Sequence, residues 1–343
     1  MLTVADVFNS NIFGMTTLTD SINEIPYVPS RLGDLGLFEV QGIATTTAFI
    51  EKMGNTLTLV QSTPRGGPGQ SVAINRREAV PFACSHLQIE DQIYADEIQN
   101  VRAFGSDNRL AGVQETVDGR LTTMSQSIDL TLEYHRMGAI QGLVLDANGD
   151  VIEDLFDKFG VAEPDDAGLL LEAAWTEADG FPVRKRINGI TRRVEAELGG
   201  ASPTGYHAMC GDQFFDALTS HPETRALYAA TVAAQQMASG VMSSRIFRYG
   251  DVTWENYRGV GSVAIPTTQA RIFPLGVPGL FKQLFSPADT MEAVNTLGLV
   301  KYALAVPDPS GKNKFIELET QSNPITFCTR PKVLIQINLG AGE

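Results

Sequence analysis

The sequence predicts an α+β protein of about two domains, from which three elongated elements extend. The chain has 343 residues, and domains average roughly 150 residues. It is 43% hydrophobic and 19% charged, which is typical of a globular protein. The elongated elements are indicated by a polar N-terminal stretch, by an alternating region with a Gly/Pro-rich loop, and by a helical apolar pattern of unusual length.

Residues 1–37 predict an N-terminal arm. The stretch is polar and is broken by two prolines and two glycines between Pro26 and Gly36, and only Leu2–Phe13 has the apolar spacing of a short helix. Such a segment buries too little apolar surface to offset the entropy of ordering it. We therefore expect it to lie extended on another surface.

Residues 38–90 predict a long β-hairpin. Polar and apolar residues alternate from Thr45 to Glu51, and the runs Thr56–Val60 and Ser71–Ile74 flank the loop sequence STPRGGPGQ. This pattern is typical of strands joined by a turn-rich tip. A two-stranded ribbon is marginally stable alone in water, so we expect it to need a partner surface. The loop glycines do not match a phosphate-binding motif and no helix start follows them.

A long amphipathic helix is predicted over residues 110–137, after a shorter one over Ile93–Phe104. Its length would be about 42 Å at 1.5 Å per residue. Interior glycines each cost about 1 kcal/mol, so tertiary packing must hold it. Gly138 and Gly142 are expected to end it. Its apolar residues recur every three or four positions: Leu110, Val113, Val117, Leu121, Met124, Ile128 and Leu132.

A short hairpin is predicted after the helix, around the turn dipeptide Asn148-Gly149. Its acids resemble the start of a calcium-binding loop. However, Val151 stands where that loop needs glycine, and Asp157 where it needs glutamate. The turn interpretation is therefore favoured.

A change of composition predicts a domain boundary near Pro164. Residues 163–179 hold six acids and no base, and residues 184–193 hold five bases and no acid. Helices are predicted over Ile187–Leu198, through Phe214–Leu218, and over Arg225–Met237. The strands predicted in this half of the chain are Tyr206–Met209, Arg245–Tyr249, Val252–Tyr257, Val263–Ile265, Arg271–Leu275, Phe315–Glu319 and Val333–Ile337.

Charge and cysteine usage argue against several classes of protein. The net charge of −14 and the pI near 4.8 disfavour a nucleic-acid-binding module. Cys84, Cys210 and Cys328 lack disulfide or metal spacing, so we expect free buried thiols. No secretory signal and no run of 18 apolar residues is found. We expect a soluble chain made in the cytoplasm.

The sequence contains no recognisable catalytic or cofactor motif. The histidines His86, His135, His207 and His221 match no metal-binding pattern. There is no G-x-S-x-G elbow, and Asn313 follows Gly311-Lys312 where a Walker motif needs Ser or Thr. We expect no cofactor, no metal and no catalytic residues.

Four parts of the chain together resemble a known family. They are the Gly/Pro-tipped hairpin before the long helix, the passage GAIQGLVLDANGD at 138–150, the strand-to-helix join AMCGDQFFDAL at 208–218, and the pair NPITF and RPKVLIQINL at 323–339. Their order resembles that of the tailed-phage major capsid proteins of the lambda coat-protein-E type, which share the Hong Kong 97 phage capsid fold.

The resemblance implies a division of the chain. Residues 1–37 would be the N-terminal arm and 38–90 the extended loop. Residues 91–163 would be the peripheral domain with spine helix 110–137, and 164–300 the axial domain. Residues 301–343 would be C-terminal strands that return to the peripheral domain.

The resemblance also implies assembly and partners. Subunits would form hexamers and pentamers in an icosahedral shell, a virion capsid made in the bacterial cytoplasm that encloses double-stranded DNA without specific binding. Portal, scaffold or protease, and decoration proteins would be partners, and no membrane would be. Loop lysine crosslinking is not expected, because Lys52 lies away from the tip. Intersubunit contacts are expected at the loop: Arg65, Gly66, Gly67, Gly69, Arg76 and Arg77.

Two alternatives remain open at this point. One is another virion structural protein, from a tail or neck. The other is a two-domain hydrolase with reactive residues near Cys210 or His207, since Cys210 precedes Gly211-Asp212 at a predicted strand end.

Overall fold

A computed structural model describes most of the chain as two compact units, each built from three stretches of sequence. Unit 1 takes the described residues of Met1–Phe49, Pro81–Arg136 and Lys282–Thr326, and unit 2 those of Ile50–Val80, Met137–Phe281 and Phe327–Glu343. Of the helices in the described part, none has both the length and the apolarity to cross a bilayer. The described residues are 14–25, 30–52, 78–99, 109–146, 148–164, 168–169, 180–239, 245–258, 265–308 and 310–340.

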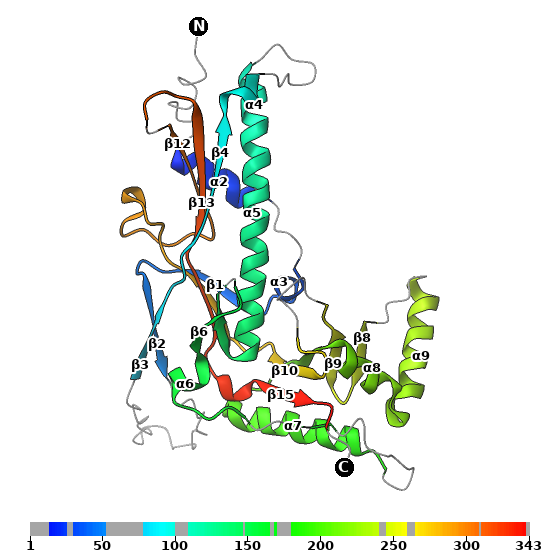
Figure 1. The fold of residues 1–343 in the computed structure, drawn as a ribbon. Helices are drawn as coiled ribbons and strands as arrows, with labels where there is room; N and C mark the ends of the chain where they lie inside the picture. Colours follow the sequence, from blue (N-terminus) through cyan, green and yellow to red (C-terminus); the bar gives the residue numbers. More distant parts are fainter. Residues whose placement is uncertain are drawn as a thin grey trace, which may run out of the picture. The chain divides into compact units, whose positions relative to one another are not determined.

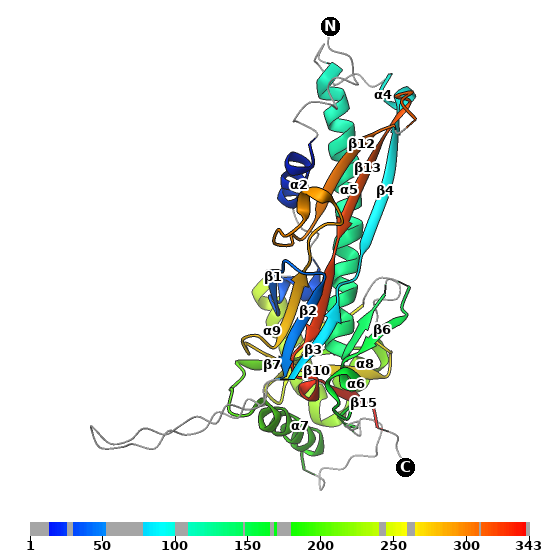
Figure 2. The same ribbon diagram turned by 90° about the vertical axis from the view of Figure 1, so that its left-hand side faces the viewer.

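A three-stranded antiparallel sheet forms the centre of unit 1 (Figures 1 and 2). Strand β13 (Phe315–Ser322) lies between β12 (Tyr302–Pro307) and β4 (Leu87–Tyr94). Because side chains alternate across a sheet, Leu318 points to the buried face while Glu317 and Glu319 point to the other. The expected helix over Ile93–Phe104 is wrong at its start, because β4 runs to Tyr94 before α4 (Ala95–Gln99) begins.

The predicted long helix is confirmed as α5 (Arg109–Gln141), and it is longer than expected. Its 33 residues span about 50 Å. Gly142, with φ +81°, follows its last residue as predicted. Gly138 does not end the helix. It lies inside it, where a Cβ would meet Leu143 O and Leu145 Cγ, each at 2.9 Å, so this glycine serves close packing.

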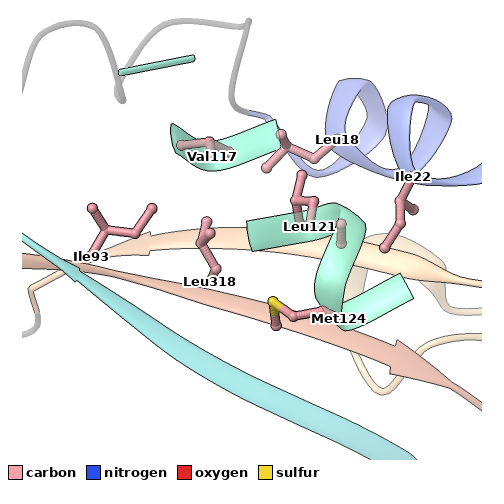
Figure 3. Close-up of a cluster of buried hydrophobic side chains, with 8 residues drawn as sticks. Leu18, Ile22, Ile93, Val117, Leu121, Met124 and Leu318 are labelled. Carbon is pink, nitrogen blue, oxygen red and sulfur yellow. The ribbon is translucent and has the colours of Figure 1, made fainter. Parts of the chain in front are cut away.

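The apolar stripe of α5 is buried in unit 1 against the sheet and helix α2 (Met15–Glu24) (Figure 3). Burying a side chain of this kind stabilises the fold by about 1.5–3 kcal/mol. Leu18 and Ile22, one turn apart on α2, enter the same cluster. The expectation of an extended arm is therefore wrong for residues 15–24. The cluster consists of Leu18, Ile22, Ile93, Val117, Leu121, Met124, Ala303 and Leu318.

A second three-stranded sheet, in the order β1–β11–β14, contains β1 (Phe38–Gly42), β11 (Phe281–Phe285) and β14 (Pro324–Cys328). Next to this sheet, the backbone at Gly298 passes very close to the backbone at Gly42 and Phe285. A Cβ on Gly298 would lie 2.0 Å from Phe285 O, and one on Gly42 would lie 2.2 Å from Gly298 O. Only glycine fits at such a crossing.

Strands β2 (Thr47–Lys52) and β3 (Glu78–Ala83) pair as a separate two-stranded sheet. The alternation predicted from Thr45 to Glu51 is confirmed as β2. The predicted strands at 56–60 and 71–74 and the loop between them lie outside the described residues.

A five-stranded sheet in the order β15–β10–β7–β9–β8 forms the centre of unit 2. Strands β7 and β9 are parallel, and the other pairs are antiparallel. The predictions of these five strands are confirmed with small shifts at their ends; the strand expected over Val263–Ile265 lies largely outside the described residues. The bounds are β7 Gly205–Cys210, β8 Ile246–Tyr249, β9 Val252–Asn256, β10 Gln269–Leu275 and β15 Ile335–Asn338.

Three predicted helices accompany this sheet: α7 (Pro182–Leu198), α8 (Asp212–Ser220) and α9 (Pro222–Ser239). The predicted apolar stripe of α7 is buried. Phe214 on α8 stacks on Trp254 with ring centroids 5.9 Å apart, and the fully buried tryptophan anchors this part of the core.

The short hairpin after α5 is confirmed as β5 (Leu143–Leu145) and β6 (Val151–Asp154). Gly149 adopts a positive φ in its turn, and Asp146 N donates to Asp150 O at 2.8 Å. Asp154 then caps α6 (Leu155–Phe159) by accepting from Phe156 N at 2.7 Å. Two 3-10 turns, Met291–Ala293 and Pro331–Val333, complete the described elements.

The two glycines of α5 provide a matched test of this packing. Gly119 has open space around it, so Gly119→Ala should raise the free energy of unfolding by up to about 1 kcal/mol. Gly138→Ala should lower it by about 1–3 kcal/mol, because the added methyl group clashes with Leu143 and Leu145. Urea denaturation followed by circular dichroism measures both. Equal effects of the two substitutions would contradict the packing role of Gly138.

Candidate assembly site

The loop residues expected to make intersubunit contacts cannot be placed. Arg65, Gly66, Gly67, Gly69, Arg76 and Arg77 all fall in 53–77, outside the described residues. The structure therefore brings none of them together. It does describe β2 and β3, which flank this segment on either side.

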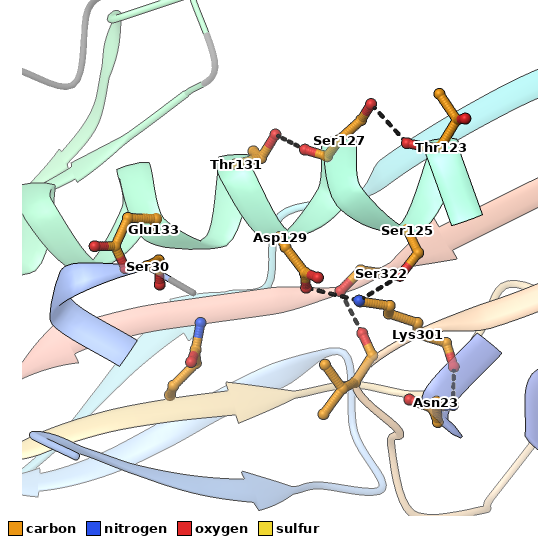
Figure 4. Close-up of polar contacts among 12 residues, drawn as sticks. Asn23, Ser30, Thr123, Ser125, Ser127, Asp129, Thr131, Glu133, Lys301 and Ser322 are labelled. Atoms are coloured by element: carbon orange, nitrogen blue, oxygen red, sulfur yellow. Dashed lines mark hydrogen bonds and ion pairs between the residues drawn. The ribbon is translucent and has the colours of Figure 1, made fainter. Parts of the chain in front are cut away.

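A buried ion pair joins three elements beneath the spine helix α5 (Figure 4). Lys301 Nζ, just before β12, lies 2.6 Å from Asp129 Oδ1, and both side chains are at most 5% exposed. The same ammonium donates to Ser125 Oγ at 2.6 Å. The Lys301 carbonyl accepts from Asn23 on α2 at 2.8 Å. Because a buried charge without a partner is costly, this cluster fixes how α2, α5 and β12 meet.

A second polar cluster holds helix α3 (Arg31–Asp34) near the end of α5 within unit 1. Leu32 N donates to Glu133 Oε1 at 2.7 Å. Arg136 lies 3.5 Å from Glu133 and donates to Gln283 Oε1 through Nε and Nη2 at 3.1 and 2.8 Å. A backbone N–H at a helix start lacks an intrahelical partner. The Glu133 carboxylate of α5 accepts the hydrogen bond from this N–H of α3 instead.

The hydroxyl groups on the exposed side of α5 donate hydrogen bonds to carbonyl groups of the same helix (Figure 4). Thr123, Ser127 and Thr131 each donate to the carbonyl four residues earlier, at 3.1–3.2 Å. Such back-bonding leaves a polar helix surface whose side chains need no outside acceptor.

The face of the β4–β13 sheet opposite α5 carries an acidic cluster, here called the acidic face, of Glu90, Glu317 and Glu319. Glu90 and Glu319 are directly opposite each other in the strand register. Like charges in that position destabilise a sheet. Burial, and next the negative charge of Glu90, raise the pKa of Glu319. At the end of this face His86 contacts Asn323 Oδ1 at 2.7 Å, and this hydrogen bond raises the pKa of His86.

The loop between β11 and β12 exposes apolar side chains in unit 1. Met291 is 91% exposed, Leu297 68% and Val294 58%, while Ala288 and Ala293 pack against Tyr302. A grouped apolar surface on an anchored loop is typical of a protein interaction site. No sequence pattern had indicated this loop.

The residues considered for a hydrolase do not form a reactive centre. Cys210 is fully buried, and burial raises the pKa of its thiol, so it is a poor nucleophile. His207 Nε2 lies 3.0 Å from Glu255 Oε2, and both side chains are buried in unit 2. Cys328 is likewise buried and Cys84 half-buried, so the expectation of buried thiols is confirmed for two of the three.

The fold of this chain is that of the phage capsid proteins. The capsid protein assigned to a prophage of Escherichia coli CFT073 has a similar structure, with a TM-score of 0.55 at 14% identity, covering 95% of this chain and 99% of that one. The fold is thus the Hong Kong 97 type of capsid fold.

The chain belongs to the family described as phage major capsid protein E, whose model matches residues 14–339. Two relatives named major capsid protein are each 26% identical to it. That of Salmonella phage Felix O1 aligns over 96% of this chain and 97% of its own length, and that of Pseudomonas phage KPP10 over 95% and 97%. The protein is a structural component of a phage head shell, and a tail, neck or hydrolytic role is not favoured.

Removing one charge of the buried ion pair should destabilise unit 1 strongly. Lys301→Met leaves Asp129 charged and buried, which costs about 3–5 kcal/mol. Adding Asp129→Leu should restore most of this loss. Arg120→Ala, which removes the half-exposed pairs to Asp91 and Glu97, is the control and should cost under about 1 kcal/mol. Chemical denaturation measures all four chains, and a double variant no more stable than Lys301→Met would refute this account.

Neutralising Glu319 should stabilise the isolated chain. A carboxyl whose pKa is raised on folding favours the folded state most at low pH, and that contribution is lost as the pH rises through the raised pKa. Glu319→Gln should therefore raise the free energy of unfolding at neutral pH by up to about 1 kcal/mol. The gain should vanish below the ordinary value of 4.5. Glu39→Gln, on the exposed part of β1, is the control; a pH-independent gain would be inconsistent with this explanation.

Proposed function

We propose that this chain assembles as hexamers and pentamers into an icosahedral shell that encloses phage double-stranded DNA. The observation that carries the proposal is the family match over residues 14–339, together with major capsid relatives that align end to end. The exposed apolar loop around Met291 and the acidic face add surfaces that suit contact with further copies.

We propose that the parts expected from the family resemblance take their roles here. Residues 1–37 act as the arm, in which α2 is a packed helix instead of extended chain, and 38–90 act as the extended loop. Residues 91–163 with the spine helix act as the peripheral domain and 164–300 as the axial domain, although 137–163 belong to unit 2 and 282–300 to unit 1. Among the C-terminal strands of residues 301–343, β12 and β13 belong to unit 1, whereas β15 pairs with β10 in unit 2.

The proposed lateral contact is made by the extended loop. Residues 53–77 contain three arginines and no acid, so the segment is basic within an acidic chain. Arginine forms two-pronged hydrogen bonds with carboxylates at interfaces. We assign Arg65, Arg76 and Arg77 to such pairs with a neighbouring copy, with Gly66, Gly67 and Gly69 shaping the tip.

The proposed setting is the virion, with synthesis in the cytoplasm of the bacterial host. Portal, scaffold or protease, and decoration proteins are the proposed partners. A net charge of −14 repels a phosphate backbone, which suits a shell that holds DNA without specific binding. The role is structural and not enzymatic, with no cofactor and no membrane.

Deleting Ser62–Ser71 tests the loop. The shortened chain should stay folded by circular dichroism and remain soluble, because the deletion removes no residue of a described helix or strand, but it should no longer form shells in negative-stain microscopy. Replacing the same ten residues by a Gly/Ser linker is the control for length, and it should also fail because Arg65 is gone. Normal shells from the deletion variant would disprove the role of the loop.

A further inference from the structure

One face of α7 in unit 2 carries a concentration of positive charge in an otherwise acidic protein. Arg184, Lys185, Asn188 and Arg192, with the 66%-exposed ring of Phe181, line an open hollow of about 230 Å³. The opposite side of the helix is buried. We call this surface the basic face.

The charge of Arg184 acts on Tyr249 within unit 2, but the cations of the basic face are otherwise without charged partners in the part of the chain that the structure describes. Among those residues, Arg184, Lys185 and Arg192 form no ion pair. Arg186, which points elsewhere, donates to Gly168 O at 2.6 Å. The helix N-terminus is also occupied, since the Glu223 carboxylate accepts from Val183 N and Arg184 N, each at 2.9 Å. A partner of the basic face would therefore meet the charged side chains of α7 and the exposed ring of Phe181 beside them, and not free N–H groups of the helix N-terminus.

The acidic face of Glu90, Glu317 and Glu319 in unit 1 carries the opposite charge. Neutral amides are its side-chain donors: Gln88 donates to Glu90 Oε1 at 2.8 Å and Gln321 to Glu319 Oε1 at 3.4 Å. Its carboxylates repel one another across the strands. Lys185 and Arg192 are two turns apart, about 10 Å along the helix. Glu90 lies about 5 Å across from Glu319, and Glu317 about 7 Å along the strand. The two clusters are therefore similar in extent and opposite in sign.

We propose that the basic face of α7 binds the acidic face of a second copy of this chain. The inference rests on the proposed shell function and names one contact within it. Because the two faces are different surfaces, the contact is head-to-tail and can close a ring of subunits. Guanidinium groups beside an aromatic ring are enriched at such interfaces.

Nucleic acid is the competing occupant of a basic face. A net charge of −14 opposes the approach of a polyphosphate at long range, while every further copy of the chain offers acidic surface. Charge complementarity between copies is therefore the better match.

Charge exchange tests the pairing with the full-length chain. Arg184→Glu/Arg192→Glu, and separately Glu317→Lys/Glu319→Lys, should each weaken self-association at least about tenfold in analytical ultracentrifugation at low salt. The four substitutions together should restore it. A mixture of the two double variants should also associate, with the two variants alternating, because native faces pair at one junction and reversed faces pair at the next. Lys312→Glu/Lys314→Glu, at the exposed β12–β13 turn, changes the net charge by the same amount and sign as Arg184→Glu/Arg192→Glu and should associate normally. Circular dichroism checks folding of every chain.

Four outcomes would overturn the pairing. One is normal association and normal shells from Arg184→Glu/Arg192→Glu while the loop deletion fails, which would leave the proposed function standing. Another is a chain with all four substitutions that stays dissociated although it is folded. A third is rescue of Glu317→Lys/Glu319→Lys by reversing Arg76 and Arg77 instead of the α7 residues. The last is loss of binding to a 30-base-pair DNA duplex, with self-association unchanged, in Arg184→Glu/Arg192→Glu.

Discussion

The apolar stripe of α5 is the constraint on which unit 1 depends. A helix of about 50 Å cannot hold itself in water with glycines in its interior, so it must be covered along its length. Strand β13 and helix α2 provide that cover in the upper cluster around Leu121, and Phe285 continues it around Ile128 and Leu132.

Apolar contacts alone would tolerate sliding of the helix on the sheet, and the buried polar groups prevent it. Lys301 and Asp129 can meet in only one register of α5 against β12, and Glu133 fixes α3 in the same way. These pairs contribute less to net stability than to the choice of one arrangement. A shell protein needs one defined packing arrangement, because many copies must adopt the same structure.

Much of the fold was predictable because it depends on local patterns, and the rest depends on distant pairs. The period of apolar residues predicted α5 and α7, and the Asn148-Gly149 turn predicted its hairpin. Gly138 was misread as a stop, because nothing local shows that Leu143 packs against it.

The same distinction holds for the candidate site. The basic face was visible as five bases in ten residues of sequence. The acidic face was not, since Glu90 and Glu319 meet only through strand pairing, and Lys301 reaches Asp129 across the fold. The loop residues expected at the interface lie outside the described part of the chain, so their prediction stands untested.

The position of β13 in the sheet has a consequence for biosynthesis. This central strand begins only at Phe315. The helix that it covers and the edge strand β4 are both synthesised earlier, because they end at Gln141 and Tyr94. A ribosome therefore completes most of the polypeptide before the middle of the sheet exists. Until then, the apolar stripe of α5 has no permanent cover. Chains that emerge from neighbouring ribosomes on one messenger RNA can therefore associate through exposed apolar surface.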